Sequence, residues 1–176
     1  MTQPKSKIQN LCMIGLMTAV IIVMAQIYLP LPSGIPMTFQ TLGIMLAGMV
    51  LGAKKGTYAT CIYIMVGLVG IPVFAGFTGG YQCLVSPTGG FILSFPALAY
   101  LSGIAVKYHK RFKGSVLLFL TLGNLINICC GTIMFCIITG ANIIAGLTTC
   151  VLPFLPITFI KIIIASIVGI SIRKRL

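Results

Sequence analysis

The sequence predicts an all-α membrane protein with six transmembrane helices and both termini in the cytoplasm. Three observations lead to this fold class. Hydrophobic residues make up 59% of the 176 residues, charged residues make up 7%, and the mean hydropathy is +1.15, which is far from the composition of soluble domains. The length accommodates about six spans of about 20 residues and leaves no room for a separate soluble domain. The basic residues alternate between successive connections.

Six apolar runs define the expected spans. Lys5 and Lys7 precede the first run, as they would in a signal peptide, but further apolar runs follow without a clear cleavage site, so we expect an uncleaved helix. Prolines and a glycine end this run, and the later connections between apolar runs are either charged or rich in glycine. Residues 139–150 are uncharged and are expected to form a loop with some helix. The spans, within one membrane domain of residues 1–176, cover residues 11–29, 37–51, 56–71, 91–106, 115–138 and 154–172.

Eleven of the twelve basic residues lie at the N-terminus, in the second and fourth connections, and at the C-terminus. All four regions fall on one side of a six-span chain, and the other three connections have no basic residue. This positive-inside pattern predicts cytoplasmic termini. A nucleic-acid-binding patch would not alternate in this way, so no nucleic-acid partner is expected.

The twelfth basic residue, Lys161, lies inside the last expected span. A lysine at the centre of a bilayer costs about 2.5–3.5 kcal/mol on insertion scales, and the chain has no Asp or Glu to neutralise it. One interpretation is that Lys161 faces a cavity that receives an anionic or strongly hydrogen-bonding guest. The alternative is that the ammonium group reaches the nearer interface and does nothing else.

The composition argues against several classes of function. Acid and base catalysis usually requires a carboxylate or a histidine. The chain has no acidic residue, and its single histidine, His109, lies in a basic connection, so no catalytic residue is expected. No phosphate-binding GxxxxGK[ST] loop and no CxxC pair occurs, so neither ATP hydrolysis nor a metal site is indicated. If the protein moves a solute, another subunit supplies the energy, although a sodium-coupled carrier built on backbone carbonyls stays open.

An uncharged connection, residues 72–90, carries the other candidate site. Glycines allow tight turns with exposed backbone N–H groups, and aromatic rings offer flat apolar surface, so this connection could fold over a small ring-shaped ligand at the membrane depth of Lys161. The alternative is an ordinary surface loop. The glycines in and beside this connection are Gly70, Gly76, Gly79, Gly80, Gly89 and Gly90, with Phe74, Phe77 and Tyr81 between them.

Small residues four apart, which let helix backbones approach closely in lipid, occur on the first two spans. Gly15 and Ala19 form one such pair, and Gly48 and Gly52 form the other. Each pair fits either a surface for a partner subunit or packing within the chain.

Three runs of sequence resemble the BioY family, the biotin-binding S components of energy-coupling factor (ECF) transporters. They are SGIPMTFQTLGIMLAGMVLGAKKG (33–56), GLVGIPVFAGFTGG (67–80) and SPTGGFILSF (86–95). The resemblance implies a multi-pass protein of a bacterial plasma membrane that captures biotin from outside and uses no cofactor. It also implies two kinds of partner, a transmembrane T component and cytoplasmic ATPase subunits. The surface that meets the T component would include Gly15 and Ala19.

The sixth span departs from the family pattern, Pro-Gly-Asp-x-x-Lys, in one respect. Lys161 is kept, but Thr158 stands where the family has the acid, and its hydroxyl is neutral. The biotin-binding residues that we expect are Lys161, Thr158, Gln40, Phe74, Gly76, Phe77, Gly79, Gly80, Tyr81, Thr88, Gly89 and Gly90. Lys161 would meet the carboxylate or the ureido oxygen of biotin, the aromatic residues would cover its apolar part, and Gln40, Thr88 and Thr158 would form hydrogen bonds. A subunit for another small vitamin or precursor and a non-transporting membrane scaffold remain alternatives.

Overall fold

The computed structural model describes residues 6–30, 35–109, 112 and 114–175. Most of these residues belong to helices, and a short antiparallel hairpin, in which Tyr28 pairs with Thr38 and Leu29 with Met37, joins the first helix to the second. The elements are α1 (Lys7–Gln26), β1 (Tyr28–Leu29), β2 (Met37–Thr38), α2 (Gln40–Leu51), α3 (Ala53–Leu68), the 3-10 helix η1 (Tyr81–Cys83), α4 (Gly89–Tyr108), α5 (Ser115–Thr139), α6 (Ile143–Cys150) and α7 (Phe154–Arg175).

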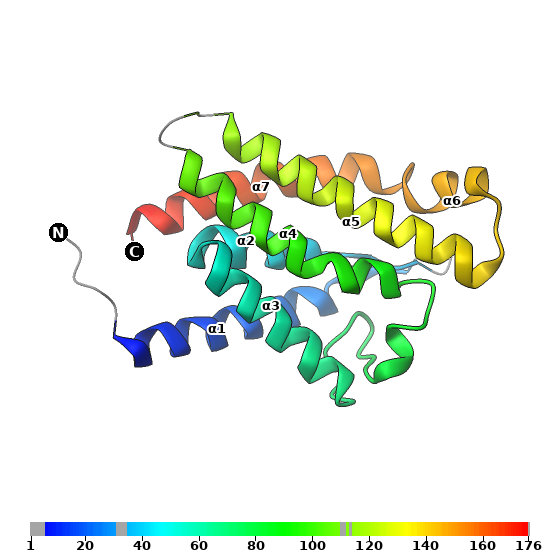
Figure 1. The fold of residues 1–176 in the computed structure, drawn as a ribbon, viewed down its shortest axis with the longest axis horizontal. Coiled ribbons are helices and arrows are strands. Elements are labelled where there is room, and N and C mark those ends of the chain that lie inside the picture. Colours follow the sequence, from blue (N-terminus) through cyan, green and yellow to red (C-terminus); the bar gives the residue numbers. More distant parts are fainter. Residues whose placement is uncertain (1–5, 31–34, 110–111, 113, 176) are drawn as a thin grey trace.

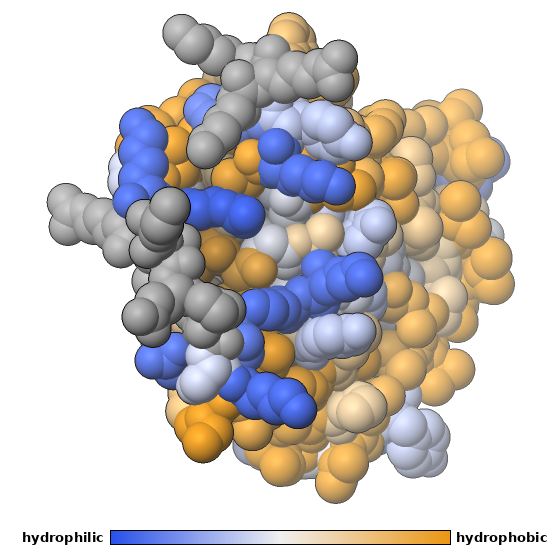
Figure 2. Space-filling view, turned by 60° about the vertical axis from the view of Figure 1, so that its left-hand side comes forward, coloured by the Kyte–Doolittle hydropathy of each residue, from blue (hydrophilic) through white to orange (hydrophobic). Residues whose placement is uncertain are grey.

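The helices form one bundle with two chemically different ends (Figure 1). The start of α1, the junction of α2 with α3, and the end of α7 lie at one end, on the left of the view. The hairpin, η1 and α6 lie toward the other end, and α4 and α5 run side by side between the two. Figure 2 shows hydrophilic side chains gathered on the first end and mainly apolar side chains along the flank.

Basic residues account for this hydrophilic end. Lys7, Lys54, Lys107 and Lys174 are exposed at helix ends that lie there. Lys5, Lys110, Arg111 and Lys113 lie outside the described residues, as does the side chain of Arg175. The described basic residues other than Lys161 thus avoid the end that carries the hairpin and α6.

Helix α2 forms the centre of the bundle. Ten of its 12 residues are buried, and it packs against α1, α3, α4 and α7. A side chain at Gly48 would collide with the backbone of Ala99 in α4, and one at Gly56 would collide with the backbone of Gly48. Internal packing therefore explains Gly48, whereas a Cβ added at Gly15 meets no described atom within 4 Å and Ala19 is exposed.

The prediction of an all-helical protein with several apolar spans is confirmed. Four helices, α1, α4, α5 and α7, are long and apolar enough to cross a membrane. Helix α2 is apolar but has 12 residues, about 18 Å at 1.5 Å per residue, and α3 has 16 residues. The count of six spans therefore stays a prediction.

Each expected span contains a helix, although several boundaries differ from expectation, and the starts of α1 and α2 differ for identifiable local reasons. Helix α1 starts at Lys7 because Ser6 caps it: the Ser6 hydroxyl accepts a hydrogen bond from the Gln9 backbone N–H, and the Gln9 side chain accepts one from Ser6. Helix α2 starts only at Gln40 because the preceding residues pair with β1. The expected loop at residues 139–150 includes the helix α6.

Candidate ligand-binding site

A cavity of about 330 Å³ lies between the first turns of α2, α4 and α7, the middle of α5, and the connection from α3 to α4. These elements place it toward the end of the bundle that carries the hairpin and η1, away from the basic end (Figure 1). Most of the surface of its wall is apolar, although many of the residues that line it are polar. The polar residues that line it are Thr38, Gln40, Thr41, Thr78, Gln82, Ser86, Thr88, Asn124, Asn127, Thr158 and Lys161.

Lys161 lies in the wall of this cavity and is 3% exposed. Its Nζ atom donates hydrogen bonds to the backbone carbonyl of Thr38 and to Oγ1 of Thr41, the latter at 3.2 Å. The ring of Phe39 lies 5.8 Å from Nζ, close enough for a cation–π contact. The side chain thus points into the protein at the start of α2, and the interpretation that it merely reaches the membrane interface does not describe this geometry.

Backbone pairing in the hairpin positions these acceptors. Pairing with β1 ends the extended segment at Thr38, whose side chain accepts a hydrogen bond from the Gln40 backbone N–H at 3.3 Å. Helix α2 then begins at once, so the Thr38 carbonyl and the Thr41 hydroxyl both face Lys161 on α7. Both partners of the amine are neutral, and the chain contains no acidic side chain that could pair with it.

Gln40 is 6% exposed and is held by a chain of hydrogen bonds. Its Nε2 donates to the Tyr63 hydroxyl, which donates in turn to the Val73 carbonyl at 3.1 Å. The ring of Tyr63 also meets Phe74 edge to face, with 5.5 Å between ring centroids. This chain ties the start of α2 to α3 and to the beginning of the glycine-rich connection.

The glycine-rich connection is fixed to α1 by the side chain of Gln26. Its Nε2 donates to the Val73 and Phe74 carbonyls, each at 3.1 Å, and its Oε1 accepts from the Phe77 N–H at 3.0 Å. The backbone turns sharply here: Gly76 has φ +70°, and Phe77, with φ +56°, is the described non-glycine residue with positive φ. The turn places Phe74 inward, 3% exposed, and Phe77 outward, 70% exposed.

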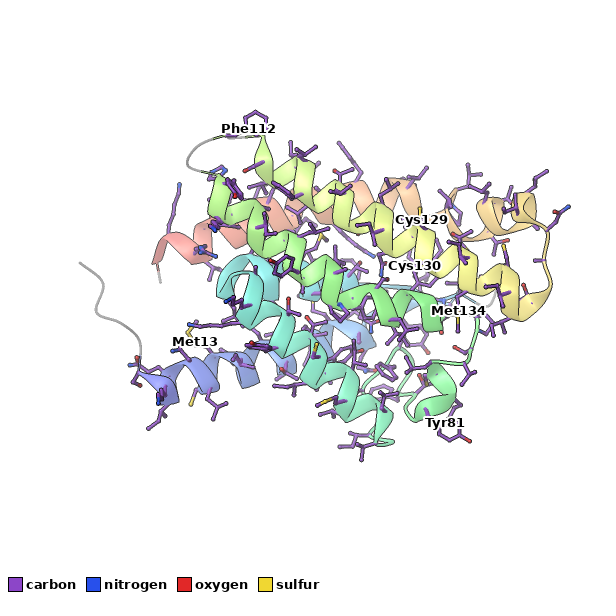
Figure 3. All side chains as sticks on the ribbon, in the orientation of Figure 1. Met13, Tyr81, Phe112, Cys129, Cys130 and Met134 are labelled. Atoms are coloured by element: carbon purple, nitrogen blue, oxygen red, sulfur yellow. The ribbon has the colours of Figure 1, made fainter. Side chains whose placement is uncertain are left out.

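Close contact between α4 and α5 forms another wall. A Cβ at Gly90 would collide with the Cys130 carbonyl and with Met134, both on the part of α5 that runs beside α4 (Figure 3). A Cβ at Gly89 would collide with the Leu84 backbone. The ring of Phe91 stacks on that of Phe154, with 6.3 Å between ring centroids, and both residues line the cavity.

Of the twelve residues that the sequence predicts to bind ligand, five line the cavity: Lys161, Thr158, Gln40, Phe74 and Thr88. The other seven do not line it. Tyr81 is 75% exposed and points away from the bundle (Figure 3), and Phe77 is turned outward as described. Gly76, Gly79, Gly80, Gly89 and Gly90 shape the backbone around the cavity: Gly76 and Gly80 have positive φ, and a Cβ at Gly79 would collide with the Ile71 carbonyl.

Seven polar residues of the lining were not predicted from the sequence: Thr38, Thr41, Thr78, Gln82, Ser86, Asn124 and Asn127. Thr38 and Thr41 flank Gln40, and their contact with Lys161 joins residues more than 100 positions apart, which no local pattern reveals. Asn124 and Asn127 did leave a signal, because two carboxamides three residues apart in an apolar span are unusual.

The arrangement is suited to binding and not to acid–base chemistry. The cavity offers one cation, several hydroxyl and carboxamide groups, and aromatic surface, which is the composition of a small-molecule site. The described residues contain no group of three or more metal-ligating side chains of the His, Cys, Asp or Glu type.

Comparison with known proteins agrees with this picture. The model of the BioY family matches residues 1–176. The chain is 30% identical to the biotin transporter BioY2 of Lactococcus lactis subsp. cremoris, covering 97% of this chain and 93% of that protein. It is 31% identical to the biotin transporter BioY of Thermotoga maritima, covering 91% of this chain and 93% of that protein. These relatives are named as transporters and not as enzymes.

A solved structure has the same fold. The crystal structure of the S component for biotin from an ECF-type ABC transporter superposes with a TM-score of 0.88 at 28% identity, covering 99% of this chain and 95% of that chain. The resemblance noted in three runs of sequence thus extends over the entire length. The chain belongs to the BioY family.

Proposed function

We propose that this protein captures biotin from outside the cell, as the S component of an ECF-type ABC transporter in the plasma membrane. The observation that carries the proposal is the cavity of about 330 Å³ with Lys161 buried in its wall. Its volume falls within the range of about 300–1,000 Å³ that is usual for small-molecule sites. Biotin offers a carboxylate or a ureido oxygen to the ammonium group and an apolar bicycle to Phe74 and Phe91. No cofactor is required.

The transporter assignment also rests on family membership and on the likeness to a biotin S component. We infer six membrane crossings with cytoplasmic termini, α2 and α3 forming a short pair inside the bundle. The gathering of basic residues at one end supports this orientation (Figure 2). The energy would come from cytoplasmic ATPases, joined to this subunit through a transmembrane T component that contacts the exposed Gly15 and Ala19 of α1.

A second candidate is a subunit of the same type for another small vitamin or precursor. The observation in its favour is Thr158, which lines the cavity where the family pattern has an acid. A pure membrane scaffold has less support, because a scaffold has no need for a cavity with a buried lysine in its wall.

The decisive experiment is equilibrium binding of radiolabelled biotin to the purified full-length protein in lipid nanodiscs. An ion pair at about 4 Å is worth about 4 kcal/mol at an effective dielectric constant of 20, before desolvation, so Lys161→Ala should weaken binding about 100-fold. Lys107→Ala, at the exposed end of α4, is the matched control and should bind like wild type.

Competition with unlabelled vitamins separates the two candidates. Displacement by biotin at the lowest concentration supports the first candidate. Displacement by another vitamin at a lower concentration supports the second, and absence of saturable binding to the wild-type protein refutes both.

A further inference from the structure

Two asparagines on α5, Asn124 and Asn127, line the cavity although they are 4% and 2% exposed. Residues three apart lie on the same face of a helix, so both carboxamides approach the cavity from one wall. We propose that the side-chain oxygens of Asn124 and Asn127 form a specificity-determining subsite that accepts hydrogen bonds from N–H groups of the ligand. This inference rests on the proposed function and extends it, because it assigns the part of the ligand that this wall selects.

The orientation of the Asn127 carboxamide is fixed by its neighbours. Its Nδ2 donates to the Phe91 carbonyl at 2.9 Å and to the Ser94 hydroxyl oxygen at 2.7 Å. The Ser94 hydroxyl in turn donates to a backbone carbonyl, that of Gly90 at 3.0 Å or Phe91 at 2.9 Å. A carbonyl only accepts, and the Ser94 proton is already used, so the nitrogen of Asn127 must face these groups and its oxygen must face elsewhere.

Asn124 is constrained in the same way. Its Nδ2 donates to the Leu120 carbonyl, one turn earlier in α5, at 2.9 Å, and to the thioether sulfur of Met45 at 3.2 Å. Both groups are acceptors, so the oxygen of Asn124 points away from them as well. Met45 belongs to α2, the helix whose first turn holds Lys161. Asn124 therefore contacts α2 directly, and both asparagines line the same cavity as Lys161.

Both carboxamide oxygens remain available. No described residue donates a hydrogen bond to either oxygen, and neither is among the described side-chain atoms that are both inaccessible and unpartnered. Each oxygen is thus reachable from open space, and the cavity is the open space that both residues line. Two accessible acceptors without a described protein donor at one wall form a site that a ligand can complete.

The chemistry of the two walls defines the ligand class. Lys161 offers a positive charge and donors, which suit an anionic or carbonyl oxygen. The oxygens of Asn124 and Asn127 carry partial negative charge and only accept, so they repel a carboxylate and suit neutral N–H donors. A cyclic urea or amide with an acidic tail matches both walls, whereas a ring acid without N–H groups matches only the first.

Selectivity between three ligands tests the subsite on the purified full-length protein. Desthiobiotin keeps the ureido ring and the acidic chain of biotin, whereas lipoate keeps a pentanoate chain on a ring without N–H groups. Wild type should bind biotin and desthiobiotin at least about 100-fold more tightly than lipoate, because lipoate leaves the acceptors unpaired. Comparable affinities for desthiobiotin and lipoate would overturn the proposal without any variant being needed.

Variants then assign the selectivity to these residues. Asn127→Ala and Asn124→Ala should each weaken biotin and desthiobiotin at least about tenfold and leave lipoate binding unchanged. Thr132→Ala, buried on α5 but outside the cavity lining, is the matched control and should preserve all three affinities. An equal loss of affinity for all three ligands would indicate that the asparagines serve packing. That result, or unchanged affinities for all three ligands, would overturn the subsite but not the proposed function. Failure of wild type to bind biotin would overturn the proposed function together with the subsite.

Discussion

At the scale of single residues, Lys161 carries a charge that no acidic side chain of the polypeptide neutralises. Its hydrogen-bond partners, the Thr38 carbonyl and the Thr41 hydroxyl, are neutral. Desolvation of an ammonium group is expensive, so the unliganded protein retains this residue at a cost in stability. Ligand binding offsets that cost when the ligand places an oxygen with a full or partial negative charge beside the ammonium group.

Lys161→Met separates stability from binding. Methionine is of similar length and fills the site without a charge, so the unfolding temperature of the ligand-free protein should equal or exceed that of wild type. Biotin affinity should fall about 100-fold, because the electrostatic attraction is lost. Thermal unfolding and a binding titration measure the two effects, with Lys107→Met as the control. A lower unfolding temperature with unchanged affinity would show a structural role for the amine.

Substitutions of two aromatic residues in the connection from α3 to α4 should differ sharply in their effects on stability and biotin binding. Phe74 is 3% exposed, lines the cavity and packs on Tyr63, so Phe74→Ala should destabilise the protein by about 3–5 kcal/mol and impair biotin binding. Tyr81 is 75% exposed, and Tyr81→Ala should leave both properties unchanged. Chemical unfolding and biotin titration of both variants check this. Impaired binding by a stable Tyr81→Ala protein would contradict the assigned cavity.

Sequence patterns locate only part of the site, for reasons that differ between residues. Lys161 stands out because a charge in an apolar run is expensive wherever it lies. The glycine-rich run predicts tight turns, but it does not tell which aromatic side chain the turns direct inward, and Phe77 and Tyr81 point outward. The partners of Lys161 come from α2, and contacts between residues so distant in the chain follow from tertiary packing, not from local pattern.

At the scale of elements, close approach of α4 and α5 shapes the wall that carries Asn127. Gly90 makes that approach possible, since any Cβ there meets the Cys130 backbone and Met134. The helices themselves followed from apolar runs and breaks. The apolar runs did not predict the central position of α2, because hydropathy does not distinguish a helix that faces lipid from one that is buried by its neighbours.

Gly90→Val should separate α4 from α5 and lower the free energy of unfolding by about 1–3 kcal/mol, the usual cost of overpacking, with a loss of biotin affinity. Gly15→Val serves as the control, because a side chain at Gly15 meets open space and both properties should stay close to wild type. Thermal unfolding in nanodiscs and biotin titration give the comparison. Full stability of Gly90→Val would mean that the two helices do not meet at this glycine.

At the scale of the whole molecule, the two ends of the bundle have separate tasks in the proposed transporter. The end with the hairpin holds the cavity, and in the proposed orientation the basic end would face the cytoplasm. The exposed small residues of α1 lie along the flank and contribute nothing to the cavity lining. Ligand capture and assembly with other subunits therefore depend on different residues.

Ala19→Leu tests that separation. The added side chain should block close approach of a partner helix, so biotin binding by the isolated protein should match wild type while uptake by cells that contain the complete transporter falls at least several-fold. Ala97→Leu, at an exposed position of α4, is the matched control and should preserve uptake. Cellular accumulation of labelled biotin is the measurement. Normal uptake with Ala19→Leu would remove this face of α1 from the assembly surface.

The most direct test of the central claim is an experimental structure of the protein with biotin bound. We predict that biotin occupies the cavity between α2, α4, α5 and α7, with one of its oxygens within hydrogen-bonding distance, about 2.7–3.2 Å, of Nζ of Lys161. Biotin bound elsewhere, or in the cavity with Nζ of Lys161 turned toward lipid or bulk water, would contradict the account.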